Sequence, residues 1–395
     1  MPASRFPIID ATRAGARLAV AACALLAPAP FAGADRAVAA EPSIAGAPWR
    51  GGFADVVQKV RPAVFSIRVK VVEDAGRGRA PQRTGASLGS GFFISADGYA
   101  VTNAHVVKPE HATALATQIR TPDGDIYDAD VIGADPQTDV ALIKVGGRND
   151  FPFVTFAEAT PRVGDWVIAI GSPFGLDGTV TTGIVSAQGR DIGYGPYNDF
   201  IQIDAPTNQG SSGGPSFDLA GNVIGVNTAL WRTPGTAGFI GIAFAVPADT
   251  VKAIVAELKE HGAVTRGWLG VELEPVTHEV AARSGLDRAR GALVGARRAG
   301  KAGANAALDA GDVITSVNGE PVKDFRALAR TTGAMAPGTR VELGVRRGGA
   351  ERTVALELAK LPDQPQPDAG AVGSPTAGRW SAAPGHKSSQ ARHKN

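Results

Sequence analysis

The chain has 395 residues, a formal net charge of +2 and 44% hydrophobic residues, which suits two globular domains with extensions. Charge this close to balance, with no sustained basic stripe, argues against a nucleic-acid partner. The single cysteine, Cys23, excludes an internal disulfide and a cysteine metal cluster from the folded body.

The first 40 residues have the pattern of a secretory signal peptide. Arg13 and Arg17 precede an apolar run at 18–32, and small-x-small cleavage patterns follow at 32–34 and 38–40. The apolar run is shorter than the ~20 residues of a spanning helix. Export is therefore expected. Two alternatives stay open: an uncleaved segment that anchors the chain to the membrane, or a lipid acceptor at Cys23. A linker follows at 41–52.

A β-rich domain is predicted for 53–261. It begins with a helix, since apolar residues recur at helical spacing from Phe53 to Val60, before Pro62. A mobile loop is expected at 73–87 because Arg, Gly and Pro interrupt the pattern there. Short β-branched runs without long alternating helices indicate sandwich or barrel packing. These runs occupy residues 64–71, 90–95, 129–133, 140–145, 166–171, 179–187, 200–204 and 223–227.

A helix opening at Pro247 and capped by Gly262 closes this domain. A second, smaller unit is predicted for 262–361, with strands at 268–273 and 313–317, a helix at 324–332, and a hairpin of 341–346 and 352–358. The remaining residues, 362–395, are rich in Pro, Gly and Ser and have no apolar period, which predicts a disordered tail.

Residues 208–215, Asn-Gln-Gly-Ser-Ser-Gly-Gly-Pro, are built like the nucleophile loop of a serine hydrolase. Glycines on both sides of a serine let the backbone turn tightly and aim amide hydrogens at one point, where an oxyanion can form. An ordinary glycine-rich turn is the alternative reading, because the chain contains 50 glycines.

A serine nucleophile needs a histidine base, which is commonly oriented by a carboxylate. His105 is the one histidine that closely follows an apolar strand, although a core histidine would look the same. Asp139 stands at the mouth of the apolar run 140–145, where burial of its charge would call for a donor such as a histidine N–H. Alternatively, Asp139 merely starts the strand in solvent, as Asp135 is expected to do.

Three segments together resemble the triad motifs of chymotrypsin-fold serine proteases, in the order His, Asp, Ser. They are 102–105 (Thr-Asn-Ala-His), 139–143 (Asp-Val-Ala-Leu-Ile) and 210–215. Further motifs at 164–175, 182–186 and 225–229 resemble the HtrA (Deg) family, and 266–271 (Arg-Gly-Trp-Leu-Gly-Val) resembles the opening of a bacterial-type PDZ domain. The resemblance implies an all-β dominated fold: a chymotrypsin-like double β-barrel followed by one small α+β PDZ domain.

The resemblance also assigns roles. Ser212 would be the nucleophile, His105 the general base and Asp139 its orienting partner. The oxyanion hole is assigned to Gly210, Ser211 and Ser212, with the amides of Gly210 and Ser212 as donors. The wall of the specificity pocket is assigned to Thr207, Asn227 and Thr228, although these residues could instead serve only strand packing. Gln209 replaces the proline common in the family, which predicts a freer backbone before the oxyanion hole.

The PDZ-like unit is expected to bind peptide C-termini by strand addition at the turn of Gly267, Trp268, Leu269 and Gly270. Phe325 and Leu328 are candidates for the wall of this groove, with ordinary core packing as the alternative.

The family resemblance implies an exported, periplasmic, ATP-independent serine endopeptidase that degrades misfolded envelope proteins under stress, with PDZ binding as regulation. It also implies a homotrimer or a higher oligomer, with a trimeric core assembled through Trp49 and Phe53. No metal or cofactor is expected, since the sequence lacks a ligand spacing such as HExxH. The alternative function is a peptide-binding chaperone or scaffold whose protease site is latent.

Overall fold

The computed structural model describes residues 52–73, 84–109, 112–232, 238–297 and 307–362. The predicted signal peptide or anchor, nearly all of the linker and the tail from residue 363 lie outside these ranges. No helix within them is long and apolar enough to cross a membrane.

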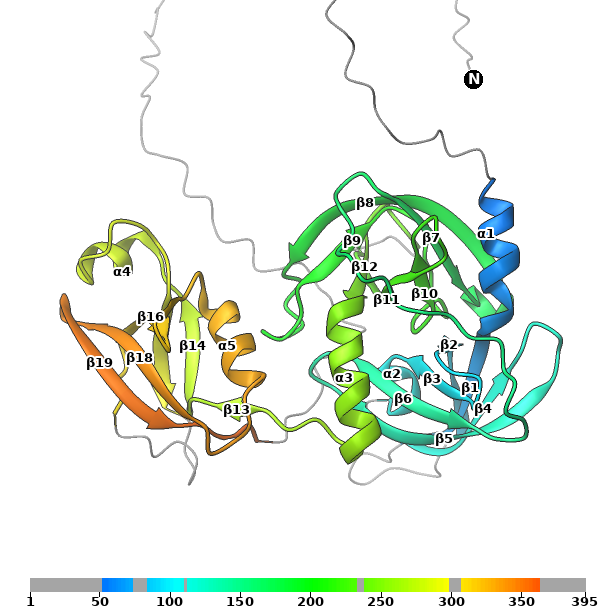
Figure 1. The fold of residues 1–395 in the computed structure, drawn as a ribbon, viewed down its shortest axis with the longest axis horizontal. Helices are drawn as coiled ribbons and strands as arrows, with labels where there is room; N and C mark the ends of the chain where they lie inside the picture. Colours follow the sequence, from blue (N-terminus) through cyan, green and yellow to red (C-terminus); the bar gives the residue numbers. More distant parts are fainter. Residues whose placement is uncertain (1–51, 74–83, 110–111, 233–237, 298–306, 363–395) are drawn as a thin grey trace, which may run out of the picture. The chain divides into compact units, whose positions relative to one another are not determined.

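The first half of the large domain is a closed antiparallel barrel with the strand order β1-β2-β3-β6-β5-β4 (Figure 1). Alternate residues of β1 point into the barrel, and those that do so, Ile67, Val69 and Val71, are apolar and buried. The inside of the barrel is therefore an apolar core. The strands are β1 (Val64–Glu73), β2 (Thr84–Phe93), β3 (Tyr99–Thr102), β4 (Ala112–Arg120), β5 (Ile126–Asp135) and β6 (Val140–Val145).

A second closed barrel follows, with the order β10-β11-β12-β9-β8-β7. Its strands are β7 (Trp166–Gly171), β8 (Thr179–Arg190), β9 (Phe200–Ile203), β10 (Pro215–Phe217), β11 (Val223–Leu230) and β12 (Ala243–Pro247), and the 3-10 turn η2 (Pro173–Gly175) joins β7 to β8. The two barrels share one apolar cluster, which includes Phe92 of the first barrel and Phe200 of the second.

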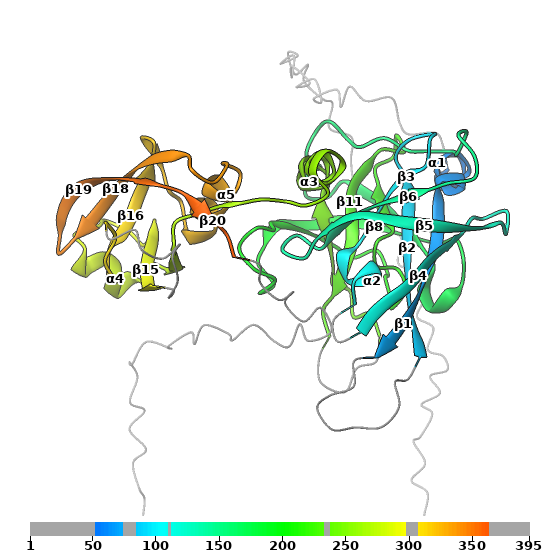
Figure 2. The same cartoon turned by 90° about the horizontal axis from the view of Figure 1, so that it is seen from below.

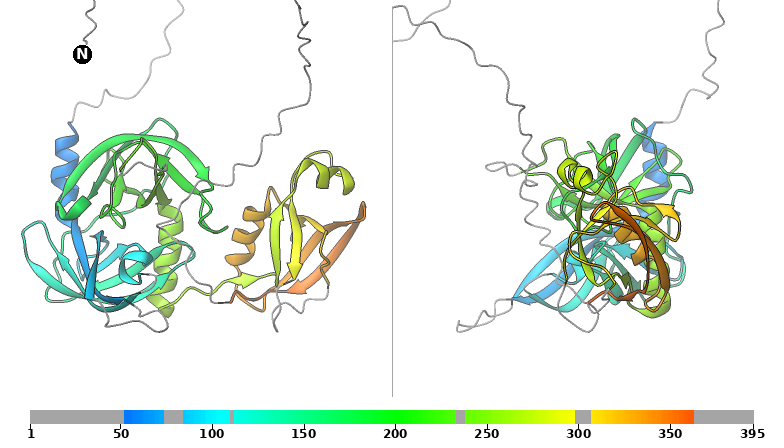
Figure 3. Two further views of the ribbon diagram at one scale, coloured as in Figure 1. Left: turned by 180° about the vertical axis from the view of Figure 1, so that it is seen from behind. Right: turned by 90° about the vertical axis from the view of Figure 1, so that its left-hand side faces the viewer.

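Two helices tie the barrels together (Figure 3). The first, α1 (Phe53–Val60), places Phe53 edge-on to Trp166 of β7 at 5.3 Å between ring centroids, and continues through η1 (Arg61–Ala63) into β1. The second, α3 (Ala248–His261), contacts β5 and β6 of the first barrel and β11 and β12 of the second. Gly262 ends α3 at φ 70°, as its predicted capping role requires.

The smaller unit is a six-stranded sheet of β14 (Val271–Pro275), β15 (Ala292–Arg297), β16 (Val313–Val317), β18 (Arg340–Arg347) and β19 (Ala350–Glu357), with β17 (Glu320–Pro321) paired to β16. The short strands β13 (Gly267–Trp268) and β20 (Ala359–Lys360) pair separately, and α4 (His278–Arg283) and α5 (Phe325–Gly333) complete the unit. Strand β14 lies at one edge of the sheet, where a further strand could pair.

The predicted barrel architecture, the helices and the final hairpin are confirmed, but several strands were not anticipated from the sequence. Strand β4 is built of alanines and threonines that are largely exposed, so it has little apolar alternation. Strand β2 begins at Thr84. The six residues from Thr84 to Gly89 include only one large apolar side chain, Leu88, so they gave no strand signal. Of the expected loop at 73–87, residue 73 belongs to β1 and residues 84–87 belong to β2, while residues 74–83 lie outside the described ranges.

Candidate active site

His105 lies on the short helix α2 (Ala104–Val107), which directly follows β3 and contacts β2 (Figure 2). Strand β3 pairs with β6, with Thr102 opposite Ala141, so the chain just after β3 lies beside the chain just before β6. This pairing brings His105 next to Asp139. The Nδ1 atom of His105 lies 2.6 Å from Oδ2 of Asp139.

Asp139 is fully buried and held from several directions. Its Oδ1 accepts the main-chain N–H of His105 at 2.9 Å, and its carbonyl oxygen accepts the side-chain amide of Asn103 at 2.7 Å. Its backbone has φ 58°, a left-handed conformation that aspartate and asparagine tolerate better than most residues. The buried carboxylate therefore has two nitrogen atoms of His105 as neighbours, one from the ring and one from the main chain.

The pKa of His105 reflects two opposing causes. Burial of the ring lowers the pKa because it disfavours the charged imidazolium, but the charge and the hydrogen bond of Asp139 raise it. The net result is a pKa above the ordinary value of 6.5. The pair therefore stabilises a positive imidazolium, which is what a base that gains a proton during reaction requires.

Asp135 was expected to remain in solvent, and this expectation is wrong, because its side chain is only 3% exposed. The guanidinium of Arg266 binds both of its carboxylate oxygens, at 2.8 and 2.6 Å, and the backbone amide of Thr138 donates to it at 3.2 Å. A bidentate charged partner explains how this carboxylate can be buried. The turn that leads into Asp139 is thus fixed at its start.

The loop around Ser212 is clamped between the two barrels. The amide of Ser90 in β2 donates to the Ser212 carbonyl at 2.8 Å, and the amide of Gly213 donates to the Asn227 carbonyl in β11 at 2.8 Å. A side chain at Gly213, whose φ is 84°, would collide with the carbonyl of Ser90. The Ser212 hydroxyl donates to the Thr228 carbonyl at 3.3 Å, and no hydrogen bond joins it to His105 within the described ranges.

The amides of Gly210 and Ser212 donate to no other group in the described part of the chain, whereas the amide of Ser211 donates to the Asn208 carbonyl at 2.9 Å. Ser211 is therefore engaged within the loop. The Gln209 carbonyl accepts the Phe174 amide at 2.8 Å, so the residue in place of the usual proline is also held.

Ser90 was missed by the sequence reasoning. Its fully buried hydroxyl donates to the Gly210 carbonyl at 2.7 Å and accepts the Ser172 amide at 2.8 Å, which orients the peptide plane behind Gly210. The available signal was a polar residue in an otherwise apolar stretch before Phe92 and Phe93.

A small cavity of about 60 Å³ opens beside the Ser212 loop and is lined by Thr207, Ser211 and Asn227 together with Ile170, Thr179 and Thr181. Two of the three predicted pocket residues therefore meet there. Thr228 does not line this cavity, since its hydroxyl accepts from the Asn103 amide at 3.0 Å while its carbonyl accepts from Ser212. The Asn227 side chain is itself bonded to Ser216 at 2.7 Å.

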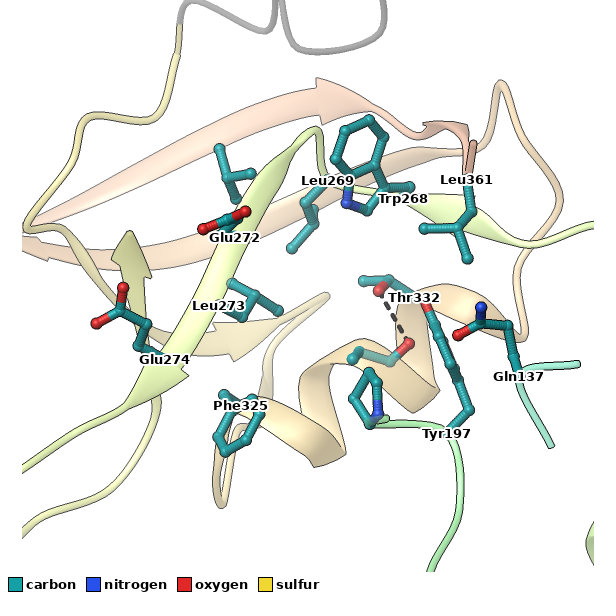
Figure 4. A pocket seen from close by; sticks show the side chains of 13 residues that line it. Gln137, Tyr197, Trp268, Leu269, Glu272, Leu273, Glu274, Phe325, Thr332 and Leu361 are labelled. Atoms are coloured by element: carbon teal, nitrogen blue, oxygen red, sulfur yellow. Dashed lines mark hydrogen bonds between the residues drawn. The ribbon is translucent and has the colours of Figure 1, made fainter. Parts of the chain in front are cut away.

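The PDZ-like unit carries a larger groove of about 370 Å³ between β14 and α5 (Figure 4). The groove is lined by Trp268, Leu269 and Phe325, as predicted, and also by Leu273. Leu328 does not, because it is fully buried in the core of the unit. The same groove is bordered by Gln137, Pro196 and Tyr197.

The predicted carboxylate-binding turn is only partly free. The amide of Gly267 donates to the Met335 carbonyl at 2.9 Å, and a side chain at Gly267 would collide with Leu358. Among the described residues, the amides of Leu269 and Gly270 donate to no other group. Gly270 has φ 81°, which turns the chain between β13 and β14.

Comparisons with known proteins agree with this architecture. Residues 89–226 match the model of the trypsin-like peptidase domain, and residues 267–358 match that of the PDZ domain. A probable periplasmic serine endoprotease, DegP-like, from Rhizobium meliloti is 49% identical over 75% of this chain and 58% of its own length. The DegP-like protein of Brucella suis is 44% identical over 80% of this chain and 70% of its own.

Among solved structures, the HtrA-type protease AlgW with a decapeptide is 34% identical, with a TM-score of 0.69 over 80% of this chain and 100% of the other. The serine endoprotease from Yersinia pestis is 29% identical, with a TM-score of 0.61 over 79% and 99%. The chain therefore belongs to the HtrA family of DegP-like serine endoproteases, with a trypsin-like peptidase domain followed by one PDZ domain.

Proposed function

We propose that this chain is an ATP-independent serine endopeptidase of unfolded and misfolded envelope proteins, with Ser212, His105 and Asp139 as its triad. The observation that carries the proposal is the buried carboxylate of Asp139, which accepts from both the ring and the main-chain nitrogen of His105. This arrangement fixes the imidazole with its second nitrogen available for a nucleophile.

The reaction follows from these positions. Ser212 Oγ attacks the substrate carbonyl carbon while its proton passes to Nε2 of His105, and the carbonyl electron pair moves onto oxygen. The amides of Gly210 and Ser212 donate to this oxyanion. Collapse of the intermediate breaks the C–N bond, and the leaving amine takes the proton from His105. Water then cleaves the acyl ester of Ser212 by the same steps, which releases the acid and restores the serine.

One observation favours the second candidate function, a peptide-binding chaperone with a latent site. The Ser212 hydroxyl donates to the Thr228 carbonyl, so its hydrogen must turn toward His105 before attack. A single side-chain rotation is a fast and inexpensive change. The endopeptidase therefore remains the better-supported function, with substrate binding as the event that aligns the serine.

Labelling by a fluorophosphonate, which reacts only with an activated serine, separates the two functions. We expect Ser212 to be labelled in the protein without its signal segment, and faster when unfolded casein is present. A protein that resists labelling with casein and with C-terminal peptides would support the chaperone function instead.

Digestion of the same casein also reports specificity. The cavity of about 60 Å³ beside Ser212 accommodates a side chain of a few carbons only. We therefore expect mass spectrometry to find Ala, Val or Ile before most cleaved bonds. Fragments ending mainly in aromatic or basic residues would show that another surface selects the residue.

We further propose that the PDZ unit binds peptide C-termini and regulates the protease. A peptide would pair with the edge strand β14, its carboxylate would accept the free amides of Leu269 and Gly270, and its last side chain would enter the groove near Phe325.

Replacement of Phe325 by alanine is expected to weaken binding of an apolar C-terminal peptide about tenfold, ~1.4 kcal/mol, because the ring supplies apolar wall to the groove. Fluorescence anisotropy measures this, with the same peptide carrying an amidated C-terminus as control. Equal affinities of the acid and amide peptides would contradict carboxylate capture.

The location and assembly are also proposals. Relatives named periplasmic support export to the periplasm, with a cleaved or anchored N-terminus. We propose a homotrimer in which the aromatic pair of Phe53 and Trp166 contributes to the contact, since Trp166 is 48% exposed and Val163 beside it is 63% exposed.

A further inference from the structure

The first barrel carries a second hollow that the proposed reaction does not use. This cavity of about 410 Å³ is lined by Leu88, Gly89, Arg68, Ile126 and Ser172, among others. Leu88 and Ile126 are 49% and 64% exposed, so the hollow has apolar side chains in its wall that are accessible to a ligand. An adjoining hollow of about 550 Å³ shares Arg68 and Gln118 with the first and adds Lys70.

The hollow comes close to the nucleophile loop through two of its lining residues, Gly89 and Ser172. Gly89 precedes Ser90, whose amide binds the Ser212 carbonyl, and a side chain on Gly89 would lie 3.2 Å from that carbonyl oxygen. The same side chain would meet Val106, the neighbour of His105, at 2.7 Å. Gly89 thus borders the hollow and also contacts the nucleophile loop and α2, so the hollow lies on the β2 side of Ser212.

The small cavity of about 60 Å³ is lined by residues of the second barrel, such as Asn227 of β11, whereas the hollow is lined mainly by strands of the first barrel. A peptide crossing Ser212 thus has one flank at β11 and the other at β2. His105 delivers its proton to the departing amine, so the residues that follow the cleaved bond leave on the side of His105. This places them in the hollow on the first barrel.

Strand pairing explains the chemistry of its wall. Leu88 of β2, Arg68 of β1 and Gln118 of β4 form one cross-strand row. In the next row Lys70 stands between Ala86 and Ala116, whose small side chains leave the space beside it open. Arg68 and Lys70 are two residues apart on β1, so both project from its outer face.

Two cations in this wall are available to a ligand. Arg68 and Lys70 are exposed and have no acidic partner within the described ranges. Nearby, Arg120 is already paired with Asp177 at 3.4 Å, and Asp128 accepts from Gln118 at 2.9 Å. Leu88 and Arg68 therefore lie in the same row of the hollow, and Lys70 lies one row farther along β1 from Ser90.

We propose that Leu88, Ile126, Arg68 and Lys70 form a leaving-side groove that selects substrates with an aliphatic residue soon after the cleaved bond and acidic residues beyond it. The inference rests on the proposed protease function and adds a substrate preference to it. The ligand of this groove is the segment of an unfolded protein that lies C-terminal to the cleaved bond.

Paired peptides test the preference. All of the peptides have the same residues before the cleaved bond and the same aliphatic residue directly after it. They differ only at the next two positions, which are Asp-Asp, Asn-Asn or Lys-Lys. We expect kcat/KM to be roughly tenfold higher for Asp-Asp than for Lys-Lys at low salt, since each exposed ion pair contributes about two- to fivefold. The difference should shrink in ~0.5 M salt, because salt screens exposed charges.

The variant Arg68→Glu/Lys70→Glu should reverse the order of the peptides, and Arg68→Gln/Lys70→Gln should abolish it. The matched control Arg162→Glu/Lys259→Glu changes two exposed cations outside the groove and should keep the native order. A p-nitroanilide with the same acyl part has no residue after its cleaved bond, so all variants should hydrolyse it at the native rate.

Three results would overturn the inference: no preference for Asp-Asp in the native protein, an unchanged preference in the glutamate variant, or an equal loss of p-nitroanilide hydrolysis. Fluorophosphonate labelling distinguishes this from failure of the proposed function. Normal labelling without acidic preference rejects the groove alone, whereas absence of labelling rejects the protease function and the groove with it.

Discussion

Replacement of Ser212 by alanine is expected to lower kcat for unfolded casein by about a millionfold, the loss seen when the nucleophile of a comparable triad is removed. Without its hydroxyl the chain can form no acyl ester, and only substrate binding and the oxyanion donors remain. Gel and mass-spectrometric assays should therefore show no fragments above the uncatalysed background.

The fold should survive this change, because the Ser212 hydroxyl makes one long hydrogen bond of 3.3 Å to Thr228. We expect the thermal midpoint to move by no more than a few degrees. Ser211→Ala is the matched control. It removes a neighbouring hydroxyl that accepts from the Asn208 amide at 3.3 Å, and it should retain most of the activity. Persistent proteolysis by purified Ser212→Ala protein would refute the assignment.

Replacement of Asp139 by asparagine is expected to lower kcat about ten thousandfold. The side-chain oxygen should keep its bond from the His105 main-chain N–H, which turns the new NH₂ group toward Nδ1 of the ring. The ring must then carry its proton on Nε2, so it can no longer accept one from Ser212. Asparagine tolerates the left-handed backbone at this position, so the fold should persist.

The pH profile tests the same contact independently. His105 must be neutral to act as a base, and Asp139 raises the pKa of its ring above 6.5. Native kcat/KM should thus fall as the pH drops through this raised pKa. In the Asp139→Asn variant burial still lowers the pKa while the raising charge is gone, so the acidic limb should move to lower pH. An unmoved limb would show that another group controls it.

Local signals in the sequence were sufficient for the architecture. Short β-branched runs indicated most barrel strands, and Gly348 and Gly349 indicated the hairpin of β18 and β19. Strands rich in alanine and threonine, such as β4, gave no such signal. They are strands because their neighbours β1 and β5 supply the pairing, which no local pattern records.

The candidate triad could also be read from short motifs, because each catalytic group sits where a strand ends or a glycine loop turns. Its supports could not. Ser90 holds Gly210 across 120 residues of sequence, and Arg266 holds Asp135 across 131. These contacts depend on which strands and loops the fold brings together.

The sequence by itself thus determined the two domains, the candidate nucleophile, base and carboxylate, and the glycines that their turns require, since these depend on short-range periodicity and local backbone geometry. Only the tertiary structure decided that Ser90 holds the loop of Gly210, that Leu328 is core and not groove, and that Leu88 and Arg68 share one wall of a hollow. The physical reason is that strand register joins residues that are distant along the chain.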